Sequence, residues 1–148
     1  MALAQPPVLD DEQIQRYHDD GYLVVEGVLN HSEIDEMAQT FDALHAKGSI
    51  PGCFTIGSPE EIARDPLQLY PRMMHPHRID PVALRFMLHP AIMNVLSGLL
   101  AEEPIAAQSM FYWKPPKARG QALHQDNFYL RVHPGTCIAA WAPLDDCD

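Results

Sequence analysis

Basic residues are scarce in this chain. Its 148 residues contain 10 lysines and arginines against 20 aspartates and glutamates, which gives a formal net charge of −10. Nucleic-acid binding depends on Lys and Arg side chains that neutralise phosphates. The sequence therefore argues against a nucleic-acid partner, and the acidic excess mainly favours solubility.

Long apolar runs are also missing. The first residues, MALAQPPVLDDEQ, have no basic region and reach two prolines before any apolar stretch of signal length. The longest apolar stretch, residues 91–100, is interrupted by Asn94, Ser97 and Gly98, and it is far too short to span a membrane. We expect neither secretion nor a membrane partner.

Cysteines are few and are not spaced in pairs. The three cysteines make an odd number, so a disulfide framework or a zinc knuckle is not expected; they are Cys53, Cys137 and Cys147. Reduced thiols fit a cytoplasmic location best. The sequence also has no GxGxxG, Walker, GxSxG or HExxH motif to support dinucleotide, nucleotide triphosphate or hydrolase chemistry.

What is present is ordinary globular composition, with 47% hydrophobic and 20% charged residues, enough for one domain. Helical patterns dominate the first two thirds. A capped helix is predicted from Asp10 to Gly21, a second from Ser32 to before Gly48, and two more over 81–88 and 90–100. Between Gly48 and Pro81 the pattern indicates a long irregular connection with a helical turn after Ser58.

Strand-like patterns follow Pro104. The runs 105–114, 122–130 and 136–144 are compatible with strands separated by Pro and Gly, and residues 22–25 form a short strand-like run earlier. Helices followed by strands predict one α+β domain. Residues 1–104 are its helical flank and loop, and residues 105–148 carry its strands.

One tripeptide in the strand region has metal-binding chemistry. On a strand, residues two apart share a face, so His124 and Asp126 point together while Gln125 points away. An imidazole and a carboxylate are two of the three ligands of the facial triad that holds Fe(II). A lone HxD tripeptide is more often a hydrogen-bonded surface pair, so its context has to distinguish the two readings.

That context carries a family resemblance. The segments that carry it are MFYWKPP at 110–116, LHQD at 123–126, AW at 140–141, LDD at 144–146 and DGYLVVEGVL at 20–29. In this register the chain resembles the phytanoyl-CoA dioxygenase family of iron- and 2-oxoglutarate-dependent oxygenases. The likeness covers both ends of the chain and is weaker in the middle.

The resemblance implies roles for six residues. His124 and Asp126 would be the iron ligands, and the 2-oxoglutarate pocket would be lined by Met110, Gln125, Trp141 and an upstream basic residue near Arg72. Each of the last four also has a purely structural explanation. Met110 and Trp141 would fill the core, Gln125 would be a hydrogen-bonded polar residue of a strand, and Arg72 would be a solvated charge in a loop. The implied cofactors are Fe(II), 2-oxoglutarate and O₂, with ascorbate as a candidate reductant.

The resemblance also implies a fold and a reaction. The fold is a double-stranded β-helix, a cupin-like jelly roll, with N-terminal flanking helices. The reaction is hydroxylation of a small organic substrate, because Asp126 fills the position that halogenating relatives leave free for halide. The family's later strands, its third ligand histidine and its cosubstrate arginine follow the acidic turn, so we expect this chain to be the front half of the domain, truncated before the rest of the barrel.

Three readings stay open at this point. The chain is a 2-oxoglutarate-dependent dioxygenase; or it is an inactive fragment or a non-catalytic metal-binding or interaction module; or it is a cupin-like module without 2-oxoglutarate. We do not expect His133, or His75 and His77 in the long loop, to supply the third ligand. An unpaired sheet edge would allow self-association.

Overall fold

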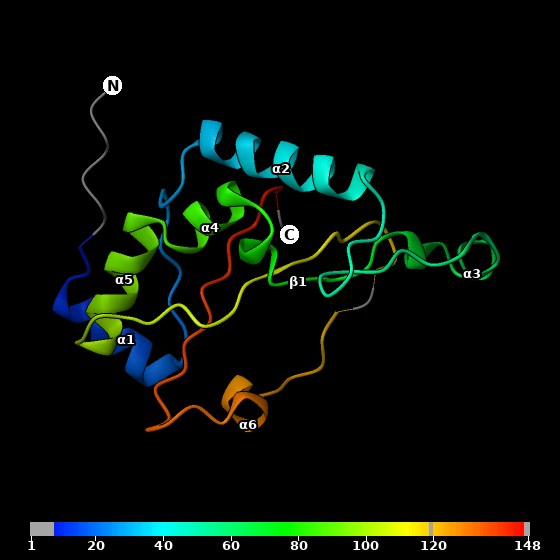
Figure 1. The fold of residues 1–148 in the computed structure, drawn as a ribbon. Coiled ribbons are helices and arrows are strands. Elements are labelled where there is room, and N and C mark those ends of the chain that lie inside the picture. The colour runs from blue at the N-terminus through cyan, green and yellow to red at the C-terminus, as the bar shows by residue number, and fades with distance from the viewer. Residues whose placement is uncertain (1–7, 119, 147–148) are drawn as a thin grey trace. The chain divides into compact units, whose positions relative to one another are not determined.

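The computed structural model describes residues 8–118 and 120–146. The chain divides into two compact units. The first unit comprises Met1–Asp35, Leu88–Ala106 and His124–Asp148, and the second comprises Glu36–Met87 and Ala107–Leu123. Figure 1 follows the chain through both units by colour.

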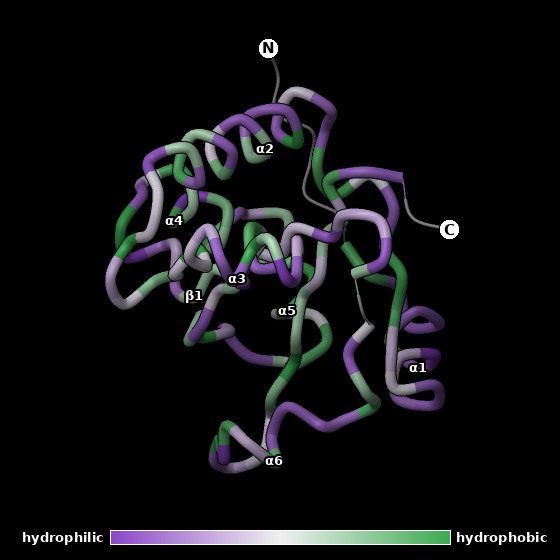
Figure 2. The backbone as a smooth tube through the Cα atoms, turned by 90° about the vertical axis from the view of Figure 1, so that its right-hand side faces the viewer, coloured by the Kyte–Doolittle hydropathy of each residue, from purple (hydrophilic) through white to green (hydrophobic). Residues whose placement is uncertain are grey.

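Helices α1 (Asp11–Asp20) and α5 (Pro90–Leu100) contact each other in the first unit, and both confirm the sequence predictions. Asp10 caps α1 in a reciprocal capping box with Gln13, and Gly21 ends the helix at a φ of 78°. Figure 2 shows α1 as mainly hydrophilic, so packing of its few apolar residues has to hold it in place.

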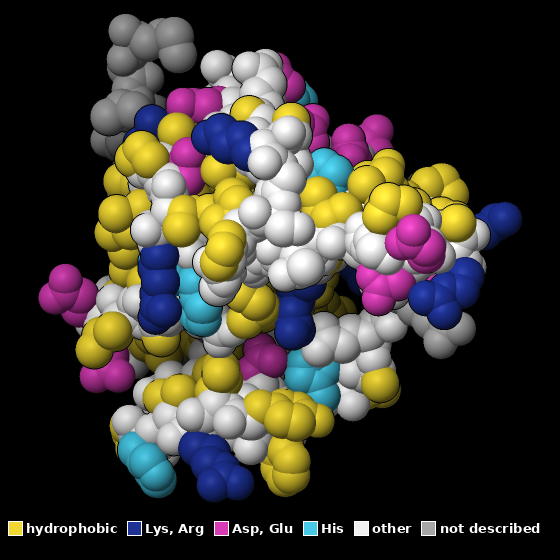
Figure 3. All heavy atoms as spheres, turned by 45° about the vertical axis from the view of Figure 1, so that its right-hand side comes forward, with side chains coloured by type: hydrophobic (Ala, Val, Ile, Leu, Met, Phe, Trp, Pro, Cys, Tyr) yellow, Lys and Arg dark blue, Asp and Glu magenta, His cyan; other side chains and the backbone are white. Residues whose placement is uncertain are grey.

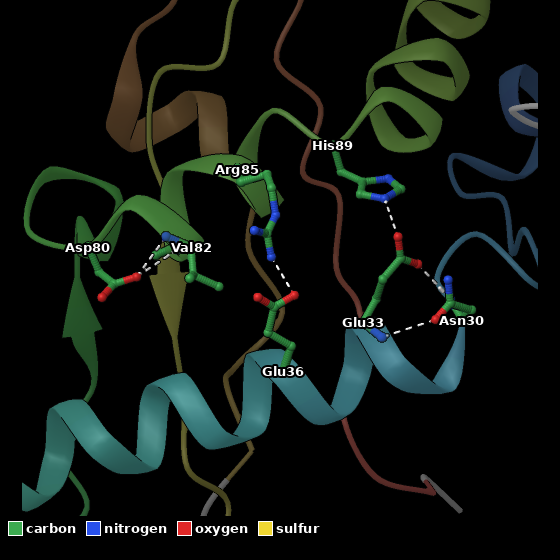
Figure 4. Close-up of polar contacts among 8 residues, drawn as sticks. Asn30, Glu33, Glu36, Asp80, Val82, Arg85 and His89 are labelled. Carbon is green, nitrogen blue, oxygen red and sulfur yellow. Dashed lines mark hydrogen bonds and ion pairs between the residues drawn. The ribbon is translucent and has the colours of Figure 1, made fainter. Parts of the chain in front are cut away.

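Helix α2 (His31–Ala46) begins in the first unit and continues into the second. Asn30 caps it: its side-chain oxygen accepts from the Glu33 N–H at 3.0 Å, and the Glu33 carboxylate accepts from the Asn30 N–H at 2.8 Å. In the second unit, Glu36 forms an ion pair with Arg85 of α4 (Pro81–Met87) (Figure 4).

The predicted irregular connection of the second unit contains short elements. Ser58 caps the expected helical turn, α3, in a capping box with Glu61. Strand β1 (Met73–Met74) then pairs with β2 (Met110–Phe111) in an antiparallel two-stranded sheet. The elements of this region are α3 (Pro59–Arg64), η1 (Pro66–Leu69), β1 (Met73–Met74), η2 (Pro76–Arg78) and β2 (Met110–Phe111).

Most buried hydrophobic residues belong to the second unit. Among the described residues these are Phe41, Leu44, Cys53, Phe54, Met73, Ala83 and Phe86, while Ala91 belongs to the first unit. Phe41 of α2 stacks on Phe111 of β2, with ring centroids 3.9 Å apart. His45 of α2 hydrogen-bonds the Leu69 carbonyl at 2.7 Å, and its ring centroid lies 4.9 Å from that of Trp113. This packing fixes the sheet against α2.

Most of the predicted strands are wrong. Within the described residues, runs 22–25 and 136–144 contain no strand, and run 105–114 contains only β2. Run 122–130 forms helix α6 (Asp126–Leu130) instead. A strand needs a partner for its backbone N–H and C=O groups, whereas a helical turn satisfies them locally. Without neighbouring strands, the local bonds prevail.

One apolar stretch meets the length and composition expected of a membrane span. Pro81–Leu100 is the single such stretch among the described residues, with a mean hydropathy of 1.4 and 22% buried. It is two helices, α4 and α5, and His89 between them caps the start of α5. Composition alone is weak evidence for a membrane helix, because core helices of soluble proteins have it too.

Candidate metal centre

His124 and Asp126 lie against each other. The His124 Nε2 donates to Asp126 Oδ1 over 3.1 Å, and the two side chains are 29% and 40% exposed. Asp126 is the first residue of α6, and Gln125 is its N-cap residue with φ −116° and ψ 123°. The strand predicted for this motif is therefore wrong, yet the two candidate ligands still point toward one another.

The geometry of this pair fits two adjacent ligands of one ion. Metal–ligand distances of about 2.1 Å place neighbouring ligands of an octahedral ion about 3 Å apart, close to the 3.1 Å between His124 Nε2 and Asp126 Oδ1. Across residues 8–118 and 120–146 no group of three His, Cys, Asp or Glu side chains is placed to hold a metal. The pair offers two ligands of a triad.

Exposed apolar side chains surround the pair in sequence. The Tyr129 ring of α6 lies 6.3 Å from the His124 ring. Trp141, predicted to line a cosubstrate pocket, is 74% exposed. Other exposed apolar side chains of this stretch are Leu123, Phe128, Tyr129 and Leu130, and Figure 3 shows hydrophobic side chains in yellow on one face of the molecule. Gln125 is exposed as well.

Two further candidate residues, Met110 and Arg72, belong to the second unit. Met110 lies in β2 opposite Met74, is 43% exposed, and its sulfur accepts from the Tyr112 hydroxyl at 3.3 Å. Arg72 is exposed and directly precedes β1. The structure thus brings Met110 and the segment after Arg72 together through the β1–β2 pairing.

Beside this pairing lies a histidine cluster that the sequence did not assign to a site. The His77 Nδ1 hydrogen-bonds Ser109 Oγ at 2.6 Å, and the rings of His75 and His77 are perpendicular, with centroids 5.6 Å apart. The Nδ1 of His75 is buried with no hydrogen-bond partner among the described atoms. His-Pro-His was visible in the sequence, but no signal pointed to Ser109, 32 residues away.

The electrostatic environment of His77 favours its neutral form. Burial lowers the pKa of the His77 imidazole below its ordinary value, and the nearby His75 and Arg78 lower it further. A neutral imidazole carries one N–H and one acceptor nitrogen, either of which can bond a hydroxyl. His77 and Ser109 therefore form a neutral hydrogen bond near pH 7.

A family model described as Phytanoyl-CoA dioxygenase (PhyH) matches residues 17–148, including the middle of the chain. "Phytanoyl-CoA dioxygenase 1" of Oryza sativa subsp. japonica is 27% identical over 95% of this chain and 62% of its own length. "Phytanoyl-CoA dioxygenase" of Arabidopsis thaliana is 26% identical over 93% and 60%.

A mammalian relative, "Phytanoyl-CoA dioxygenase, peroxisomal" of Mus musculus, is 24% identical over 95% of this chain and 44% of its own length. No solved structure matches the chain. The chain spans 62% of the length of the Oryza sativa relative and 60% of the length of the Arabidopsis thaliana relative.

Proposed function

Because the chain belongs to the phytanoyl-CoA dioxygenase family, we propose that it is an Fe(II)- and 2-oxoglutarate-dependent dioxygenase that hydroxylates a small organic substrate. Family membership supports the dioxygenase class broadly. The observation that carries the finer proposal is the contact of His124 Nε2 with Asp126 Oδ1 at 3.1 Å, inside the matched region.

In this proposal His124 and Asp126 hold the iron. The imidazole nitrogen and the carboxylate oxygen are the donors that non-haem Fe(II) takes in a facial triad. The 3.1 Å between His124 Nε2 and Asp126 Oδ1 is close to the spacing of two neighbouring ligands on one ion, which supports the assignment. When bound, iron with 2-oxoglutarate and O₂ supplies the oxidising power for C–H hydroxylation, and ascorbate is the candidate reductant that keeps the iron ferrous.

The cosubstrate 2-oxoglutarate is a dianion, so its site needs a positively charged side chain. Apolar side chains would form the walls of the site. Arg72 offers a guanidinium that binds carboxylates in a two-pronged geometry. Met110 and Trp141, which are 43% and 74% exposed, offer apolar surface that a bound ligand would cover, and Gln125 offers an amide. We assign these four residues to 2-oxoglutarate binding.

The rest of the proposal concerns the whole domain. The family implies a jelly roll, whereas the described residues contain one two-stranded sheet. We propose that the α+β chain supplies the helical flank of that fold together with the segment that carries His124 and Asp126. The substrate's identity lies beyond fold analogy. A cytoplasmic location and self-association through an unpaired sheet edge stay predictions.

Succinate release from 2-oxoglutarate in the presence of Fe(II) tests the proposed activity. The assay compares this chain, a form extended at its C-terminus by the strands of a relative, His124→Ala and the matched control His133→Ala. We expect the extended form to release succinate, this chain to release little, His124→Ala to abolish release, and the control to match its parent. His133 is an exposed histidine of the same unit.

An extended form that binds iron at His124 and consumes no 2-oxoglutarate with a wide substrate panel would overturn the oxygenase proposal. The chain would then be a non-catalytic metal-binding module. Equal loss in His124→Ala and His133→Ala would instead point to general damage by histidine removal and would withdraw support from His124 as the ligand.

A further inference from the structure

The two-stranded sheet of the second unit is very short. Only Met73 with Phe111 and Met74 with Met110 are paired. Strands of globular proteins usually have about 5–6 residues, and an isolated two-stranded ribbon is marginally stable in water. Something beyond the ladder has to hold β1 and β2 in this register.

Two contacts just outside the ladder stabilise this register. The His75 N–H donates to the Ser109 carbonyl at 2.9 Å and so extends the pairing by one step. The His77 Nδ1 then bonds the Ser109 hydroxyl at 2.6 Å, in a partly buried setting. Ser109 therefore receives both a backbone and a side-chain contact from the turn that follows β1.

The backbone conformation of His75, in the turn after β1, is unusual for a non-glycine residue. His75 has φ 53° and ψ 44°, in the left-handed region that non-glycine residues seldom adopt. This conformation leads from β1 into η2, which carries His77. Met73 within β1 is completely buried, which anchors the other end of the same segment. The turn is fixed at both ends.

We propose that His77 and Ser109 are positioning residues for the cosubstrate site, since their hydrogen bond fixes Met110 against the segment that begins at Arg72. This inference rests on the proposed function, in which Met110 and Arg72 bind 2-oxoglutarate. Ser109 immediately precedes Met110, and His77 follows Arg72 by five residues. Loosening the bond lets the two candidate binding residues move independently.

The test uses side-chain replacements that separate the two imidazole nitrogens. In asparagine the polar atoms sit on Cγ, as Nδ1 does in histidine, so His77→Asn keeps a partner for Ser109. In glutamine they sit one bond further, in place of Nε2, so His77→Gln loses it. Ser109→Ala removes the bond from the other side, and His133→Gln is the matched control in the first unit.

The first readout is the NMR spectrum of methyl-labelled methionine in the intact chain. We expect the Met74 and Met110 methyl resonances to shift in His77→Gln and Ser109→Ala, to stay near the parent in His77→Asn, and to be unchanged in the control. The methyl resonance of Met93 of α5 reports on the first unit and should not shift in any variant. Parent-like Met74 and Met110 resonances in both His77→Gln and Ser109→Ala would overturn the inference.

The second readout is the affinity for 2-oxoglutarate of the Fe(II)-loaded chain under anaerobic conditions, followed through the same methyl resonances. Loss of one well-placed hydrogen bond predicts binding about tenfold weaker in His77→Gln and Ser109→Ala, with recovery in His77→Asn. Parent-like affinity in both weakened variants overturns this inference and leaves the proposed function standing. A parent chain that does not bind 2-oxoglutarate overturns the assignment of Met110 and Arg72 to cosubstrate binding, and this inference with it.

Discussion

Removal of the His89 side chain breaks two contacts of the first unit at once. Its Nδ1 accepts from the Ala91 N–H at 3.3 Å and caps α5, so in the neutral ring the Nε2 carries the proton. That Nε2 donates to Glu33 over 3.0 Å, and the same carboxylate bonds the Asn30 N–H at the start of α2. Figure 4 shows the contacts of Glu33 with His89 and Asn30.

The expected cost of His89→Ala follows from these two contacts. Loss of an N-cap costs about 1 kcal/mol. The contact of His89 with Glu33 contributes at most about 1 kcal/mol, because its side chains are 15% and 26% exposed and water replaces part of what is lost. We expect the free energy of unfolding to fall by about 2 kcal/mol in His89→Ala.

Two companion variants separate the contributions. Asparagine is among the best N-cap residues but does not reach Glu33, so His89→Asn should recover about 1 kcal/mol of the loss. Glu33→Gln keeps an acceptor oxygen for Asn30 and should cost less than His89→Ala.

Urea denaturation followed by circular dichroism measures all three, provided the slope of free energy against urea is unchanged. A loss in His89→Ala below about 0.5 kcal/mol, or no recovery in His89→Asn, would refute the capping argument.

Three further predictions concern the second unit and its thiol. Phe41→Ala removes a buried ring that stacks on Phe111 at 3.9 Å, so the free energy of unfolding should fall by about 3–5 kcal/mol; a loss under about 1 kcal/mol in urea denaturation would contradict this packing. Burial raises the pKa of the Cys53 thiol, so iodoacetamide should alkylate Cys53 more slowly than Cys137 in the folded chain and equally fast in urea, and equal rates in the folded chain would show the site to be open. The pKa of His77 is lowered by burial and by its positive neighbours, so the unfolded chain takes up the proton at higher pH and the free energy of unfolding falls as pH drops from the ordinary histidine pKa to the lowered one; an NMR titration of His77 that gives an ordinary or raised pKa is the contrary result.

The helices were predictable because their signals are local. Asp10 and Ser58 cap helices through side chains three residues from their partners, and Gly21 ends α1 through its own backbone freedom. Strands depend on partners remote in sequence, which explains why residues 122–130 were predicted as strand while the structure forms α6.

The candidate site was predictable in part for the same reason. His124 and Asp126 are two residues apart, so both strand and helix-start geometries bring their side chains together, and the contact follows despite the wrong secondary structure. The partnership of His77 with Ser109 spans 32 residues and carries no local signal. Only the three-dimensional pairing of β1 with β2 shows it.

Anaerobic Fe(II) titration monitored through histidine ring resonances tests whether His124 and Asp126 share one iron ion, as proposed. We expect Fe(II) to broaden the His124 resonances first, at concentrations that leave His133 sharp, and Asp126→Ala to remove this preference. Equal broadening of His124 and His133, or unchanged broadening at His124 in Asp126→Ala, would contradict the claim.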